Sequence, residues 1–159
     1  MVEPKFAPRE VFDQILEWSV IPTFDLVIEY EGSIIMVKRK LAPYKDQWAL
    51  PGLRMLKGES IDNTLVRIAK NEFSLKVDPS SKVFLGQYVG RFKTEHNRQD
   101  LSTGYYIKSP DGQFAWINQA HFSSRRSISS RSQIPSQTGA MYSYYLGLYF
   151  DLKESGQLK

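Results

Sequence analysis

The residues of this chain that could do chemistry gather in one stretch, residues 48–77, WALPGLRMLKGESIDNTLVRIAKNEFSLKV. Glu59 precedes a predicted helix, and Arg67 and Glu72 lie near the polar border of that helix. Carboxylates bind divalent cations, and guanidinium groups bind phosphates in a planar fork. The stretch therefore indicates a site for a phosphorylated, anionic ligand.

Two turns and a helix must position these side chains. Pro51 and Gly52 turn the chain after a short apolar run, and residues 57–60 form a second turn that ends in a serine N-cap. Apolar residues then recur at three-, four- and seven-residue steps, which predicts a helix with one face on a core. These residues are Ile61, Leu65, Ile68 and Leu75.

The spacing resembles the signature of the Nudix hydrolases, G-x5-E-x7-R-E-U-x-E-E-x-G-U with U aliphatic. In that family the loop and helix hold a divalent metal against a diphosphate. Glu59 stands at the first acidic position and Arg67 at the arginine. Leu53 stands at the opening glycine, although Gly52 keeps the first glycine of the usual Pro-Gly-Gly. The resemblance implies an α/β fold, an α/β/α sandwich with a mixed sheet between helices.

The helix is depleted in acids relative to that signature. Ile68 and Asn71 replace two carboxylates, which leaves Glu72 as the helix acid of the signature. Mg²⁺ takes about six oxygens, commonly one or two from protein carboxylates and the rest from water and phosphates. Glu72 and the backbone carbonyl of Gly52 could therefore hold one Mg²⁺, or Mn²⁺. Such a site favours stabilising a departing diphosphate over activating water with two metals.

One Nudix subfamily, the GDP-mannose mannosyl hydrolases, resembles this chain in keeping the arginine and the last glutamate alone. The likeness covers roughly residues 10–107 and includes Phe24–Val27, Lys38–Arg39, Trp48, Arg54 and Ser102–Tyr105. It implies Mg²⁺-dependent hydrolysis of a nucleotide sugar at the glycosyl carbon, which releases the sugar and a nucleoside diphosphate.

The resemblance also implies roles for single residues. Arg39, Arg54 and Tyr105 would stabilise the leaving diphosphate, and Asp25 would face the nucleotide or sugar. Arg67, braced by Glu59, would support the loop and helix or touch substrate. Other interpretations stay open, because Asp25 could be a turn or edge residue and Lys38–Lys40 a solvated charge run.

The general base is not evident from the sequence. In the subfamily a histidine lies a few residues before a tryptophan that resembles Trp116, and this chain lacks it. Asp111 and His121 flank that position, and His96 lies in a polar loop. Any of the three could serve, or none, because a histidine pKa near neutrality suits a base but also suits a solvated side chain.

Two further functions remain open. The chain could be an ordinary Nudix pyrophosphohydrolase that recruits acids from elsewhere, with Glu95 and Asp111 as candidates. It could also be a non-catalytic nucleotide-binding module, a hypothesis that the missing acids and histidine motivate. The products released would separate the three.

Composition limits the other possibilities. At 159 residues the chain is expected to form a single domain over 1–159. It has no cysteine, which excludes disulfides and thiolate metal sites and suits a cytoplasmic protein. We expect no signal peptide and no membrane span. A net charge of +4 suits an anionic ligand but is mild for nucleic acid, which we do not expect as a partner. A homodimer is possible.

The remaining pattern predicts the elements around this site. Helices are expected over 8–18, with Val11, Ile15 and Trp18 on one packed face, and over 139–152. Strands are expected over 23–30, 33–39, 82–92, 101–108 and 113–118. The serine- and arginine-rich residues 123–137 are expected to form a flexible loop, either a solvated connector or a lid whose arginines meet phosphate. Residues 153–159 are expected to be a polar tail.

Overall fold

A mixed sheet lies between helices in the computed structural model, which describes residues 3–93, 96–109, 114 and 116–158. The elements in chain order are α1 (Arg9–Trp18), β1 (Ile21–Tyr30), β2 (Ser33–Arg39), β3 (Trp48–Ala49), β4 (Gly52–Arg54), α2 (Ile61–Phe73), β5 (Asp78–Arg91), β6 (Gln99–Lys108), β7 (Phe122–Ile128), the short 3₁₀ helix η1 (Arg131–Gln133) and α3 (Ala140–Glu154). No helix among these described residues is long and apolar enough to span a membrane.

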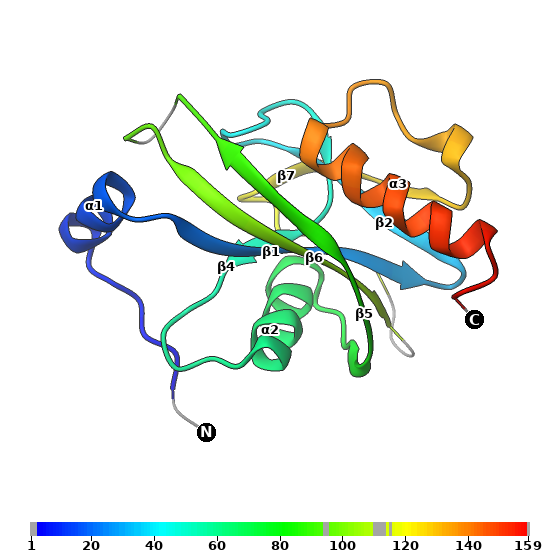
Figure 1. Cartoon of the computed structure of the whole chain (residues 1–159), viewed down its shortest axis with the longest axis horizontal. Helices are drawn as coiled ribbons and strands as arrows, with labels where there is room; N and C mark the ends of the chain where they lie inside the picture. The colour runs from blue at the N-terminus through cyan, green and yellow to red at the C-terminus, as the bar shows by residue number, and fades with distance from the viewer. Residues whose placement is uncertain (1–2, 94–95, 110–113, 115, 159) are drawn as a thin grey trace.

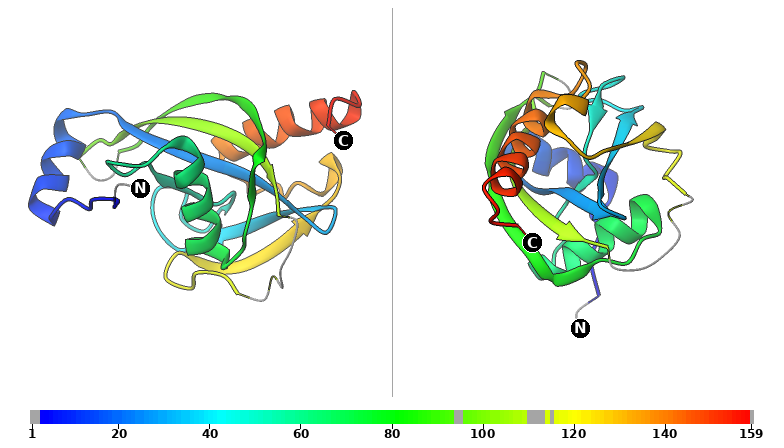
Figure 2. Two further views of the ribbon diagram at one scale, coloured as in Figure 1. Left: turned by 90° about the horizontal axis from the view of Figure 1, so that it is seen from below. Right: turned by 90° about the vertical axis from the view of Figure 1, so that its right-hand side faces the viewer.

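The sheet separates two hydrophobic clusters. Within the described residues its seven strands include a path ordered β3-β2-β1-β6-β5, with β4 paired to β1 and β7 paired to β2. The β1–β6 pair is parallel and the other pairs are antiparallel. Alternate residues of β1 face opposite clusters, because Leu26 packs with α2 and Val27 packs with α3. The helices α2 and α3 therefore cover opposite faces (Figures 1 and 2), and the predicted α/β/α sandwich is confirmed.

The strands β1 and β2 diverge soon after the turn that joins them. They pair with each other at Glu29–Ile34 and Tyr30–Ser33. Further along, β1 pairs with β4, whereas β2 pairs with β3 and β7. Where the two strands have separated, Asp25 of β1 and Arg39 of β2 line a common cavity.

The expectation of a loop over 123–137 is wrong for its first half. Residues 122–128 form β7, which pairs with Ile34–Arg39 of β2. Its two buried ends, Phe122 and Ile128, flank five exposed residues. This strand is held by backbone hydrogen bonds to β2, which any residue but proline permits. Its serine and arginine residues therefore show no alternation of apolar and polar side chains that would predict a strand. Conversely, no strand forms around Trp116 over the described residues 114 and 116–118.

The helix α1 packs with a different face from the one its pattern indicated. Phe12 and Leu16 are buried, and with Ile21 they form a small cluster of their own. The expected packed residues Val11, Ile15 and Trp18 are exposed, Trp18 by 81%. Both sets recur at helical spacing, so the sequence alone could not tell which one meets the protein. In Figure 1 this helix lies at one end of the molecule, away from α3.

Candidate functional site

A cavity of about 510 Å³ opens where the sheet splits. It brings together seven of the candidate site residues named from the sequence, which are Asp25, Arg39, Gly52, Arg54, Arg67, Glu72 and His121. Neither Glu59 nor Tyr105 lines the cavity, although Glu59 contacts the lining residue Arg67. The volume lies within the range of small-molecule sites, so a nucleotide-sized ligand suits it.

The start of α2 is fixed by its own side chains. Ser60 Oγ accepts a hydrogen bond from Asn63 N at 3.1 Å, and Asn63 Oδ1 accepts one from Ser60 N at 3.5 Å. This reciprocal capping satisfies two backbone donors that a helix would otherwise leave unpaired. The predicted serine N-cap is therefore confirmed, and Arg67 and Glu72 of the helix that it starts line the cavity.

Glu59 and Arg67 form a brace between the loop and the helix. Arg67 Nε donates to Glu59 Oε2 at 2.7 Å, and Arg67 Nη2 donates to Glu59 Oε1 at 3.0 Å and to the Arg54 carbonyl at 2.7 Å. Burial pushes the pKa of Glu59 up, but hydrogen bonds from Arg67 and from Leu56 N outweigh it and hold this pKa below its usual value. Glu59 is thus an ionised, buried partner that keeps Arg67 in place.

Glu72 is a buried acid whose partner is a histidine. Its side chain is 1% exposed, and His121 Nδ1 lies 2.9 Å from Oε1 and 3.0 Å from Oε2. Asn118 N also donates to the Glu72 carbonyl at 2.8 Å, which ties the segment before β7 to the end of α2. His121 therefore belongs to the cavity, one residue before β7.

The other two acidic positions of the helix signature, 68 and 71, are occupied by uncharged residues. Ile68 is fully buried in the cluster under α2. Asn71 Nδ2 donates to Glu72 Oε1 at 3.3 Å. Across the residues that the structure describes, no three acids, histidines or cysteines group closely enough to hold a metal by themselves. The helix thus offers a single carboxylate to the cavity.

Asp25 is the second buried acid of the cavity, with 4% of its surface exposed. Ser102 Oγ donates to its Oδ2 at 2.5 Å. A Cβ at residue 52 would lie 2.1 Å from Asp25 Oδ1, so Gly52 is required for this close approach. Burial raises the pKa of Asp25 to about 7, while the Ser102 hydrogen bond and the Arg39 charge oppose the rise.

The arginines of the cavity are held by backbone and aromatic contacts. Arg39 Nε donates to the Pro43 carbonyl at 2.6 Å and the Leu41 carbonyl at 3.2 Å. The guanidinium carbon of Arg54 lies 4.0 Å from the centre of the Phe12 ring, a cation–π contact. Phe12 belongs to α1, so this helix forms part of the cavity wall. Sequence reasoning missed this role, because it requires a tertiary contact.

The structure does not bring Tyr105 to the cavity. Its ring lies 6.1 Å from that of Phe24 and 6.0 Å from that of Phe84, against the cluster under α2. The expected contact of Tyr105 with a diphosphate is therefore not supported. His96 also lies elsewhere, where its Nδ1 is 3.2 Å from Glu17 Oε2 of α1. The candidates Glu95 and Asp111 fall outside the described residues.

We expect Asp25 to make stability depend on pH in an unusual direction. Its folded pKa of about 7 lies above its ordinary value of 3.8, so between these values the folded protein holds a proton that the unfolded chain releases. The stabilisation that this bound proton gives to the folded protein is complete below pH 3.8, and it is lost as the pH rises through 7. Relative to Asp25→Asn, the unfolding free energy of the wild type should fall by about 4 kcal/mol from pH 4 to pH 8.

Urea unfolding of both proteins across this range measures that difference. Arg39, Arg98 and Asp100 also act on Asp25 and are unchanged in the variant, so they cancel to first order. A difference that stays flat or grows with pH would show that Asp25 is ionised in the folded protein.

Sequence comparisons relate parts of the chain to two curated proteins. No family model matches the chain. It is 28% identical over 94 residues to the low-salt glycan biosynthesis protein Agl8 of Haloferax volcanii, over 59% of this chain and 56% of that protein. It is 39% identical over 64 residues to the ADP-ribose pyrophosphatase of Methanocaldococcus jannaschii, over 40% of this chain and 37% of that protein. The matches thus span about half or less of these relatives.

Solved structures match over most of the chain. The crystal structure of a MutT NUDIX hydrolase from Burkholderia pseudomallei superimposes with a TM-score of 0.71 and 15% identity. The match covers 82% of this chain and 98% of that one. The chain therefore has the Nudix hydrolase fold.

Proposed function

We propose that the protein is a Mg²⁺-dependent hydrolase of a nucleoside diphosphate sugar of the GDP-mannose type, which cleaves at the glycosyl carbon. The observation that carries this proposal is the single carboxylate that α2 offers to the cavity, Glu72, with buried Ile68 and Asn71 at the other positions. Attack of water at phosphorus by this fold draws on several helix acids that gather metal ions around the nucleophile. In attack at carbon the metal does not have to gather around the nucleophile, and one ion that neutralises the departing diphosphate is enough.

The donor set fits one divalent ion. Glu72 and the Gly52 carbonyl would hold it, and the diphosphate and water would complete about six oxygens. In this structure both oxygens of Glu72 lie within hydrogen-bond distance of His121 Nδ1, so a cation on Glu72 would replace that contact. When bound, the ion neutralises negative charge on the departing diphosphate.

The residues of the chain supply the rest of the chemistry. Arg39 and Arg54 bind the diphosphate and stabilise the charge that it gains on leaving. Water attacks the glycosyl carbon, the bond from this carbon to the bridging oxygen breaks, and its electron pair leaves with the diphosphate. His121 takes the proton of the water, because it is the described histidine that lines the cavity. Glu59 supports the site through Arg67.

The names of the relatives support both a sugar substrate and an alternative. The Haloferax protein is named for glycan biosynthesis, which favours a sugar-linked substrate. The Methanocaldococcus protein is named a pyrophosphatase of ADP-ribose, which favours cleavage at phosphorus. Both substrate classes join a diphosphate to a sugar, so the bond that breaks decides between them.

Hydrolysis of GDP-mannose in ¹⁸O-labelled water tests the proposal. With Mg²⁺ we expect mannose and GDP as products, with no label in GDP, because cleavage at carbon leaves the unlabelled bridging oxygen on GDP. Release of GMP and mannose 1-phosphate would instead establish a pyrophosphohydrolase. A rise in melting temperature with GDP-mannose, without any product over hours, would favour a nucleotide-binding module.

We also expect Mg²⁺ to move one histidine signal and spare the other. The chain has two histidines, of which His121 lies on Glu72 and His96 lies on α1. If a cation displaces His121 from Glu72, titration with Mg²⁺ and GDP should shift the ring resonances of His121 in ¹H–¹⁵N spectra. Those of His96 should stay in place and serve as the internal control. Equal shifts of both, or none at His121, would contradict a metal on Glu72.

A further inference from the structure

The Asp25 carboxyl is connected to α3 by a buried chain of hydroxyl groups. Ser102 and Tyr145 are both fully buried. Ser102 Oγ donates to Asp25 Oδ2 at 2.5 Å and lies 2.8 Å from the Tyr145 hydroxyl oxygen. Because Ser102 has one proton and gives it to Asp25, the Tyr145 hydroxyl donates to Ser102 Oγ. The chain therefore runs from α3 along the face of the sheet that α3 covers, to the cavity.

The two strands beside Asp25 are shaped to admit this arrangement. In the sheet Asp25 lies opposite Gly52 of β4 on one side and Gly104 of β6 on the other. A Cβ at residue 52 would lie 2.1 Å from Asp25 Oδ1, and one at residue 104 would lie 2.4 Å from ring atoms of Tyr145. Side chains at either position would push apart Asp25 or Tyr145, so both glycines are needed for the chain of contacts.

The charges in the cavity indicate what Asp25 faces. Arg39 and Arg54 suit a diphosphate, whereas Asp25 would repel one when ionised and has no charge to attract one when neutral. Hydroxyl groups of a sugar can hydrogen-bond to either oxygen of a carboxyl. With Oδ2 bound by Ser102, Oδ1 beside Gly52 is the oxygen left for ligand. Asp25 therefore suits the sugar part of a nucleotide sugar.

We propose that Ser102 and Tyr145 are positioning residues that hold Asp25 Oδ1 toward a hydroxyl of the substrate sugar, and so set specificity for the sugar-bearing nucleotide over the bare diphosphate. This inference rests on the proposed function. Neither residue touches substrate, and both act through Asp25. Hydrogen bonds to a carboxylate contribute more than neutral ones, so loss of Ser102 Oγ should be measurable.

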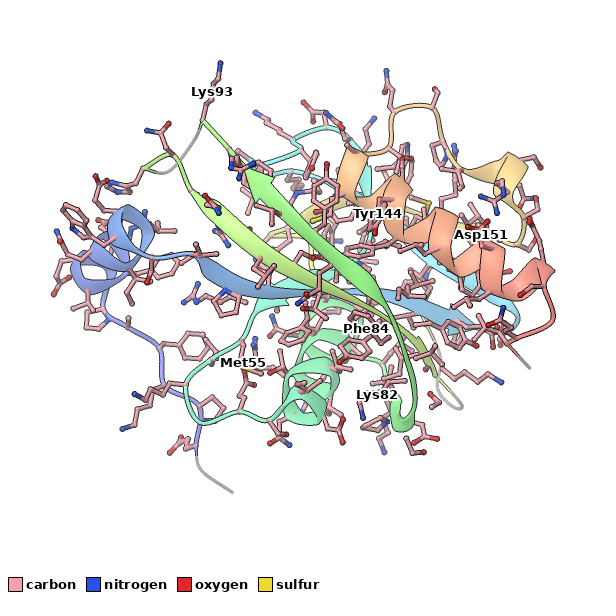
Figure 3. The ribbon with its side chains drawn as sticks, viewed as in Figure 1. Met55, Lys82, Phe84, Lys93, Tyr144 and Asp151 are labelled. Carbon is pink, nitrogen blue, oxygen red and sulfur yellow. The ribbon has the colours of Figure 1, made fainter. Side chains whose placement is uncertain are left out.

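Matched variants separate positioning from general damage. Ser102→Ala removes the hydroxyl that holds Asp25, and Thr103→Ala removes its neighbour on β6, whose Oγ1 binds Gln87 instead. Tyr145→Phe removes the far hydroxyl, and Tyr144→Phe removes that of the adjacent, more exposed tyrosine on α3 (Figure 3). Ser102→Thr keeps the hydroxyl and should restore the wild-type behaviour.

The kinetic test compares GDP-mannose with GDP. In Ser102→Ala we expect the KM for GDP-mannose to rise about fivefold or more, while the inhibition constant of GDP stays within about twofold. Tyr145→Phe should show the same pattern more weakly, and the two control variants should match the wild type. In an Asp25→Asn background, Ser102→Ala should add nothing. Equal weakening of GDP-mannose and GDP would overturn the proposal.

Crystal structures of the variants decide the point independently of activity. The Asp25 carboxyl should turn away from its position in Ser102→Ala and keep it in Thr103→Ala. A carboxyl that stays in place in Ser102→Ala overturns the proposal, whatever the kinetics. If the wild type hydrolyses no GDP-mannose, the proposed function fails, and calorimetric binding of GDP-mannose and GDP to the same variants supplies the comparison in place of KM.

Discussion

Replacing Glu72 by glutamine should lower turnover of GDP-mannose by about a hundredfold or more, with the fold intact. The substitution keeps the size of the side chain and a group that can accept a hydrogen bond from His121, but it removes the negative charge that would hold a cation in the cavity. Losing one preorganised electrostatic contact to a transition state typically costs this much. Initial rates at saturating Mg²⁺ measure the effect, and the melting temperature monitors the fold.

An acid on the same helix provides the control. Asp62 lies in the first turn of α2, is half exposed and pairs with Lys82 Nζ at 2.8 Å on the surface. Asp62→Asn should leave turnover within about twofold, because exposed pairs of this kind contribute little. Wild-type turnover in Glu72→Gln would remove the basis of the proposed function, since no other carboxylate of the described part of α2 lines the cavity.

The loop and helix around Glu72 were predictable because their causes are local. The N-cap at Ser60 depends on residues three apart, and the buried stripe of α2 depends on a period that a sequence displays directly. Glu59 and Arg67, which form the brace, are eight residues apart in the sequence and belong to one loop and the helix that follows it. The N-cap, the buried stripe and the ion pair all lie within this one loop and helix, so the sequence could predict them together.

The roles of Tyr105 and Asp25 depended on register, which sequence alone does not reveal. In the parallel pair of β1 and β6, Leu26 lies opposite Tyr105 and Asp25 lies opposite Gly104. Paired residues share a face and neighbours alternate, so Tyr105 lies on the opposite face from Asp25. The Ser102 contact follows from the same register, which places Ser102 on the Asp25 face. The register of β1 against β6 therefore determines where Asp25, Ser102 and Tyr105 all point.

His121 was left open because the strand near it was misplaced. The strand was predicted around the aromatic Trp116, whereas residues 122–128 form it, with five serine and arginine residues between Phe122 and Ile128. With β7 beginning at Phe122, His121 sits directly before a strand that pairs with β2, at the edge of the split in the sheet. A strand held through backbone hydrogen bonds and buried only at its two ends carries no alternating pattern that a sequence could display.

Replacing Arg67 by alanine should destabilise the protein by about 3–5 kcal/mol, the usual cost of leaving a buried charge without its partner. The side chain of Glu59 is 2% exposed, and its carboxylate would keep hydrogen bonds from Leu56 N and Thr64 Oγ1 alone. Urea unfolding at pH 7 measures the loss, with Lys82→Ala, which breaks a surface pair, expected to leave the midpoint unchanged. Adding Glu59→Gln to Arg67→Ala should restore part of the stability, because the buried charge disappears. A double variant as unstable as the sum of both single variants would show instead that Arg67 stabilises the loop through its contact with the Arg54 carbonyl.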